Sequence, residues 1–215
     1  MKKRVSLSNR LIQADTILNN ILSTEDIFNE LVLYGYDKEK LNSTLKLVGE
    51  VRELDNRQQR EYAEQYQASD NFEQALNSFY KTYMRSLKIA RLAFGDHTEA
   101  RVALLLDGIR QQSFGGIQKQ AEAFYGNLIT NPEYLKTINR FNLTADMLQQ
   151  QYTALKELVT LSNLHQKEKG EAVEATRNRD EKADQLDKFI AELVKICKIA
   201  FDEVPQNLKM IGVTV

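Results

Sequence analysis

Apolar residues recur at intervals of three and four along most of the chain, a spacing that predicts amphipathic helices rather than strands. The clearest pattern follows Asp37, a helix-capping residue, and an equivalent pattern follows Thr144. Each contains two adjacent apolar stripes, which are Leu41, Leu45 and Val48 beside Leu47, Val51 and Leu54, and then Leu148, Tyr152 and Leu155 beside Ala154, Leu158 and Leu161. Two adjacent stripes are wide enough to face the core of a helical bundle.

A second pair of stripes predicts another core-facing helix in each half of the chain. They are Leu76, Phe79, Tyr83, Leu87, Ala90 and Phe94, and then Ala183, Leu186, Ile190, Val194, Cys197 and Phe201. Short helices are predicted over 8–22 and 117–129, up to about Leu33 and Asn139, and over 98–106 and 205–211. Thr24 and Asn131 are expected to cap the second helix of each half, and Gly35 and Asn142 suit left-handed backbone at its exit.

The patterns coincide because the chain repeats itself. The segment 13–94 aligns with 120–201 without a gap, and 17 of the 82 aligned pairs are identical. We interpret this as a tandem duplication with repeats 1–107 and 108–215, joined near Gly115-Gly116. The two repeats are expected to form one compact domain about a pseudo-two-fold axis.

A polar tract interrupts the apolar pattern in each repeat, at 55–71 and 162–180. Two interpretations remain open. Each tract is either the tip of a long helical hairpin, with a turn near 68–71 and 175–178, or the middle of one very long helix in an extended rod. We favour the hairpin, because most helices are short and because Ser69 and Thr176 are potential caps. Two hairpins would form a four-helix core with the short helices covering its ends.

Composition supports an all-α, internally duplicated bundle, since only 2 Pro and 9 Gly occur among 215 residues. The net charge is −1 and no basic stripe is evident, which argues against nucleic-acid binding. No apolar run approaches the length of a membrane span, and the basic start is followed by polar residues rather than an apolar signal segment. With a single Cys197, the sequence is typical of a cytoplasmic, bacterial-type protein, and a membrane role is not expected.

The sequence favours a protein that is not an enzyme and needs no cofactor. Cys197 occupies a core stripe where the other repeat has Ala90, so we interpret it as a small buried residue rather than a nucleophile. No glycine-rich phosphate loop or zinc-binding spacing is present. One alternative is a cation or small-ligand site between the repeats, whose candidate ligands are Glu61, Glu64, His165, Glu168 and Glu171. The competing interpretation of these residues is a solvated helix face.

Several polar residues recur in both repeats while their apolar neighbours vary. Asn56 and Gln59 align with identical residues at Asn163 and Gln166. Three explanations are open: a buried hydrogen-bonding layer that fixes helix register, a contact surface, or ordinary helix-surface composition.

Aromatic residues distinguish the first repeat from the second. Tyr62, Tyr66 and Phe72 align with polar or smaller residues, so they predict either asymmetric core packing or a protein-binding patch. The function we expect from the sequence is therefore a structural or protein-interaction bundle, whose partner is another protein or a second copy of the chain.

Overall fold

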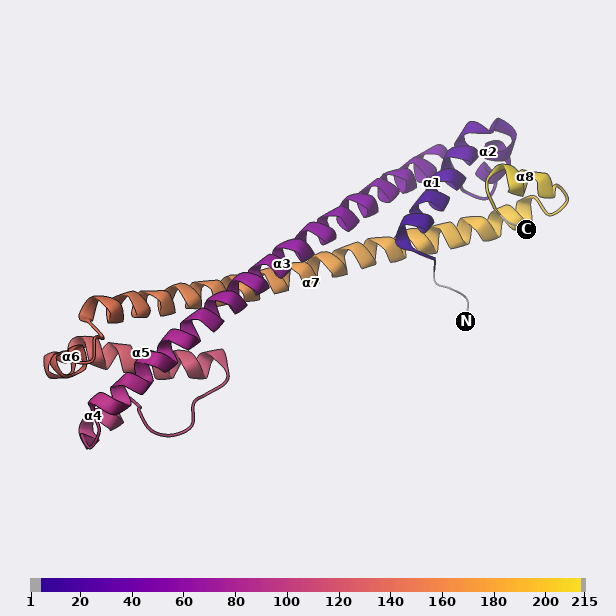
Figure 1. Cartoon of the computed structure of the whole chain (residues 1–215). Helices are drawn as coiled ribbons and strands as arrows, with labels where there is room; N and C mark the ends of the chain where they lie inside the picture. Colours follow the sequence, from indigo (N-terminus) through magenta and orange to yellow (C-terminus); the bar gives the residue numbers. More distant parts are fainter. Residues whose placement is uncertain (1–4, 214–215) are drawn as a thin grey trace. The chain divides into compact units, whose positions relative to one another are not determined.

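The computed structural model describes residues 5–213. Among them, eight helices and no strands are formed (Figure 1), which confirms the all-α prediction. The helices are α1 (Leu7–Ser23), α2 (Glu25–Val32), α3 (Lys38–Ala93), α4 (Thr98–Ala103), α5 (Phe114–Thr130), α6 (Pro132–Asn139), α7 (Ala145–Ala200) and α8 (Pro205–Met210).

The helix boundaries repeat along the chain with the same offset as the sequence. Adding 107 to the bounds of α1, α2, α3 and α4 gives the bounds of α5, α6, α7 and α8. The backbone at the exits repeats as well, since Gly35 and Asn142 both have positive φ, at 81° and 58°. The helix pattern therefore agrees with the repeat seen in the sequence, and tandem duplication is our interpretation of both.

Most of the predicted caps form. The Asp37 side chain accepts a hydrogen bond from the Lys40 amide at 2.8 Å, and Thr144 accepts from the Met147 amide at 3.3 Å. Asn131 caps α6. The prediction for Thr24 is wrong, because its side chain makes no capping hydrogen bond at the start of α2. The caps that form satisfy amide groups that have no partner within the helix.

The hairpin prediction is wrong. Both polar tracts lie inside uninterrupted helices of 56 residues, α3 and α7, as Figure 1 shows. The residues expected to cap new helices instead bond back to their own helix: Ser69 donates to the Gln65 carbonyl at 2.9 Å and Thr176 to the Ala172 carbonyl at 3.0 Å. A hydroxyl that bonds four residues back continues a helix rather than ending it.

The chain forms two compact units, which divide it within the long helices. The first unit contains residues 5–63 and 170–213, and the second contains Glu64–Lys169. Each unit therefore combines the first part of one repeat with the last part of the other, and the divisions fall away from the boundary between the repeats.

In the first unit, α1, α2 and α8 pack with the beginning of α3 and the end of α7 (Figure 1). Its core contains the predicted stripe residues Leu41 and Val48 together with Leu186, Cys197 and Phe201, all buried. In α1, residues Ile17, Leu18 and Ile21 are fully buried. The predicted apolar faces are thus the faces that form this core.

In the second unit, α4, α5 and α6 pack with the end of α3 and the beginning of α7. Its core is richer in aromatic residues, since Tyr83 forms edge contacts with Phe124 at 5.6 Å and Phe124 with Tyr125 at 5.0 Å between ring centroids. Tyr83, Phe124 and Tyr125 are all fully buried. Across residues 5–213, none of the helices has a stretch long and apolar enough to span a bilayer.

Candidate functional site

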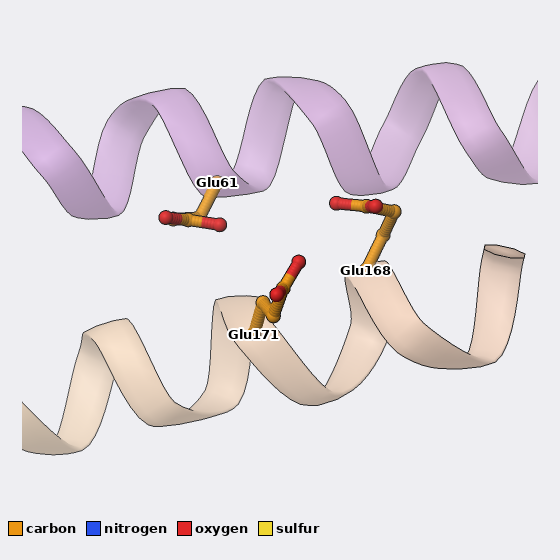
Figure 2. A group of neighbouring side chains, drawn as sticks. All are labelled: Glu61, Glu168 and Glu171. Atoms are coloured by element: carbon orange, nitrogen blue, oxygen red, sulfur yellow. The ribbon is translucent and has the colours of Figure 1, made fainter.

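Three of the five predicted metal ligands lie close together. Figure 2 shows Glu61 on α3 and Glu168 and Glu171 on α7, and one carboxylate oxygen from each lies within 4.8 Å of the others. Glu61 and Glu171 belong to the first unit, and Glu168 precedes Glu171 by three residues on the same helix. Carboxylate oxygens are the ligand type that hard divalent cations prefer.

Basic side chains already balance part of this acidic group. Glu61 pairs with Arg57 at 3.1 Å and Glu168 pairs with Lys167 at 3.2 Å. Glu168 is 8% exposed, and its second carboxylate oxygen is buried without a hydrogen-bond partner. An acidic group of this kind is common without an ion, so we assign no metal to it.

The other two predicted ligands do not join the group. Glu64 is exposed on α3. The His165 ring stacks on Phe72 at 5.6 Å between centroids, with 22° between the ring planes. His165 therefore packs against an aromatic ring in the second unit.

The predicted buried polar layer is wrong. Asn56, Gln59, Asn163 and Gln166 all lie at exposed positions of α3 and α7. Their identity in the two repeats therefore does not come from a buried register-fixing contact. It fits the surface explanations.

A polar network does connect α3 and α7 in the first unit, but it uses other residues. Arg179 donates to the Gln58 side-chain oxygen at 2.8 Å and lies 3.6 Å from the Asp55 carboxylate. Thr176 lies 3.4 Å from both the Gln58 amide nitrogen and the Tyr62 hydroxyl. The Arg179 side chain is only 19% exposed, so this network is the partly buried polar contact that the sequence analysis sought one position away.

The three predicted aromatic contact residues have different environments. Tyr66 is 63% exposed. Tyr62 is half-buried beside Thr176, and Phe72 packs edge-on against Phe114 at 5.2 Å. Tyr62 belongs to the first unit and Phe72 to the second, and of the three only Tyr66 presents most of its surface to solvent.

Two residues with catalytic potential have structural roles. Cys197 is fully buried, and burial raises the pKa of its thiol to about 11, which suppresses the reactive thiolate. His97 caps α4, because its Nδ1 accepts from the Ala100 amide at 3.2 Å. The interpretation of Cys197 as a buried core residue is confirmed.

Large apolar side chains are exposed at matching positions of the two repeats. Three aligned pairs share this exposure: Tyr34 and Phe141 at 41% and 39%, Tyr66 and Val173 at 63% and 64%, and Leu92 and Ile199 at 70% and 63%. Each repeat has five such residues within the 82 aligned positions, so independent placement would pair fewer than one.

Sequence reasoning missed a hollow in the second unit, which is lined by Lys81 and Arg85 of α3 and by Leu143 just before α7. One signal was present in the alignment. Lys81 is identical to Lys188, yet Thr82 and Leu143 are much smaller than their counterparts Phe189 and Tyr36.

No family model, curated protein or solved structure matches this chain. The candidate functions below therefore rest on its own residues.

Proposed function

We propose that the protein is a non-enzymatic structural module of the cytoplasm that self-associates through its exposed apolar side chains. The observation that carries this proposal is the exposure of large apolar residues at three matching pairs of positions, which include Leu92 with Ile199 and Tyr66 with Val173. Apolar side chains repeatedly left in solvent are characteristic of contact surfaces.

A second copy of the chain is the partner that this arrangement favours. A contact between identical copies uses the same surface on both, and a chain that carries equivalent surfaces twice can engage more than one copy. The charge balance does not oppose such contacts, because 29 basic and 30 acidic residues leave a net charge of −1.

The non-enzymatic part of the proposal is supported by the roles of the reactive side chains. Cys197 is a buried thiol with a raised pKa, and His97 and His165 are engaged in a helix cap and an aromatic stack. These environments favour packing over nucleophilic or acid–base chemistry.

Sedimentation velocity combined with light scattering over a wide concentration range tests self-association. The full chain is expected to form multimers as its concentration rises. Replacing Leu92 and Ile199 together by Ser is expected to weaken assembly about tenfold or more, because exposed apolar anchors dominate contact energies.

Ile12→Ser is the matched control. Ile12 is 59% exposed, and its aligned residue in the second repeat is Lys119. This variant is expected to assemble like the parent chain. A monomer at every concentration would overturn the proposal, and an equal effect of Ile12→Ser would show that the matching positions have no special role.

A further inference from the structure

The most enclosed of the described hollows lies in the second unit. It has a volume of about 340 Å³ and lies between the second half of α3 and the residues that begin α7. Sites for small molecules usually have volumes of about 300–1,000 Å³. The hollow is therefore large enough for a small organic molecule.

The lining of this hollow carries positive charge and no acidic residue. Lys81 and Arg85 lie one turn apart on α3, and neither forms an ion pair with any residue of the described part of the chain. The start of α7 also lines it, and the beginning of a long helix carries partial positive charge. The electrostatics of the hollow therefore favour an anion.

A fixed polar group lies at the buried side of the hollow. The Gln151 side-chain oxygen accepts hydrogen bonds from the Ser86 hydroxyl at 2.7 Å and from the Tyr125 hydroxyl at 3.0 Å. Burial raises the pKa of Tyr125, so its hydroxyl stays protonated and donates. These two bonds orient the Gln151 amide so that its NH₂ group is left to donate.

The other walls are apolar. Ile89, Leu143 and Met147 contribute aliphatic or thioether surface, and Phe141 adds an aromatic ring. A second, more open hollow of about 590 Å³ shares Lys81, Arg85 and Ile89 with the first and extends along α3. A ligand that fits this lining has an anionic group and an apolar body.

The equivalent position in the first unit shows what closes such a hollow. There the aligned residues are Tyr36 in place of Leu143, Phe189 in place of Thr82 and Glu192 in place of Arg85. The Tyr36 hydroxyl donates to Glu192 at 2.8 Å, and its ring packs edge-on against Phe189 at 5.8 Å. Lys40 lies 4.1 Å from the centre of the Tyr36 ring, so the same place is filled and its charges are paired.

We propose that the hollow of the second unit binds a small organic oxyanion with an apolar body, through Lys81 and Arg85. The Arg85 guanidinium and the Lys81 ammonium pair with the anionic head, and Gln151 donates a further hydrogen bond. The apolar body lies against Leu143, Met147 and Ile89. This site is independent of the self-association proposed above.

Calorimetric titration of the full chain with octanoate and with octyl phosphate tests the site, because the two probes share a tail and differ in the anionic head. At least one of them is expected to bind saturably with one molecule per chain, and the tighter one identifies the head group as carboxylate or phosphate. Octylammonium, which has the same tail and the opposite charge, is expected not to bind. Failure of both anions to bind saturably overturns the proposal.

Two lysines provide a matched pair of variants. Lys81→Ala is expected to weaken binding of the better probe about tenfold, which is the effect of losing one charge-assisted hydrogen bond. Lys188→Ala removes the aligned lysine of the first unit and is expected to leave binding unchanged. Both lysines are exposed, so neither change disturbs a core. Equal weakening by the two variants would show non-specific attraction and overturn the proposal.

Leu143→Tyr tests the site without removing a charge, since it gives the second unit the residue that fills the first. It is expected to abolish binding of both anions while the helix content measured by circular dichroism stays unchanged. Retained binding in a folded Leu143→Tyr variant would contradict the assigned position.

Discussion

In the first unit, Tyr36, Phe189 and Glu192 fill the space beside the start of α3, whereas in the second unit Leu143, Thr82 and Arg85 leave a hollow beside the start of α7. The helices around both places have boundaries at aligned positions of the two repeats, so the backbone plan is the same. A few side chains therefore decide whether this position stabilises the unit or is available to a ligand.

A second pair of equivalent positions differs in the same way. Arg179 and Gln58 form a hydrogen bond in the first unit, and their counterparts Phe72 and His165 stack in the second. One repeat plan thus accommodates a polar contact between the long helices in one unit and an aromatic contact in the other. The comparison predicts that matched substitutions will affect the two units differently.

The largest expected effect comes from giving the first unit the residue of the second. Tyr36→Leu is expected to lower the free energy of unfolding by about 2–4 kcal/mol, because it removes a ring that is 1% exposed and a hydrogen bond to Glu192. Urea denaturation measures the change. Tyr34→Leu is the control, since Tyr34 is 41% exposed and the same change there is expected to cost less than about 0.5 kcal/mol. Equal costs at the two positions would show that the Tyr36 cluster does not hold the first unit together.

The contacts between the long helices provide the next prediction. Phe72→Ala is expected to cost about 2 kcal/mol independently of salt, because the lost contacts are with Phe114 and His165. Arg179→Ala is expected to cost about 1 kcal/mol and less in high salt, because its partners are Asp55 and Gln58. Urea denaturation at low and high salt separates the two.

Arg177→Ala is the control for this pair, since its side chain is 66% exposed and its ion pairs are long, at 3.9 and 4.0 Å. It is expected to change stability by less than about 0.5 kcal/mol. A salt-dependent cost at Phe72, or none at Arg179, would contradict the assignment of aromatic and polar contacts.

Alkaline pH is expected to weaken the first unit through Cys197. Its folded pKa of about 11 exceeds the ordinary thiol value of 9.0, so the unfolded chain loses this proton first. Stability therefore falls as pH rises from 9 through 11, by about 1 kcal/mol at pH 10. Thermal unfolding at pH 8 and 10 measures the loss, and Cys197→Ala, which introduces the residue found at Ala90, is expected to reduce it. An unchanged loss in that variant would assign it to other groups.

The sequence predicted much of this fold because its signals are local. The stripes that contain Leu41, Leu87, Leu148 and Leu186 are the buried faces, and Asp37 and Thr144 cap the long helices as expected. Helix continuity was misjudged because a Ser or Thr hydroxyl can end a helix or bond back within it, and only the structure shows which occurs.

The contacts between helices were harder to predict, because they depend on helix phase and on residues far apart in the chain. The repeated Gln59 and Gln166 are exposed, while the neighbouring Gln58 makes the contact. Likewise, the hollow joins Arg85 to Leu143 and Gln151, and its existence follows from side-chain size at two distant positions. Identity between repeats marks shared ancestry or surface constraint and does not locate such a site.

The smallest predicted effect distinguishes a continuous helix from a turn. Gly170 lies within α7, and a Cβ added there would meet no atom within 4 Å. Gly170→Ala is therefore expected to stabilise the protein by about 0.5–1 kcal/mol, because alanine loses less conformational freedom in a helix. Gly35→Ala is the opposing control, since φ at Gly35 is 81° and alanine there costs about 1 kcal/mol. Urea denaturation measures both. Destabilisation by Gly170→Ala would indicate a turn at that position, and the hairpin would regain support over the 56-residue helix.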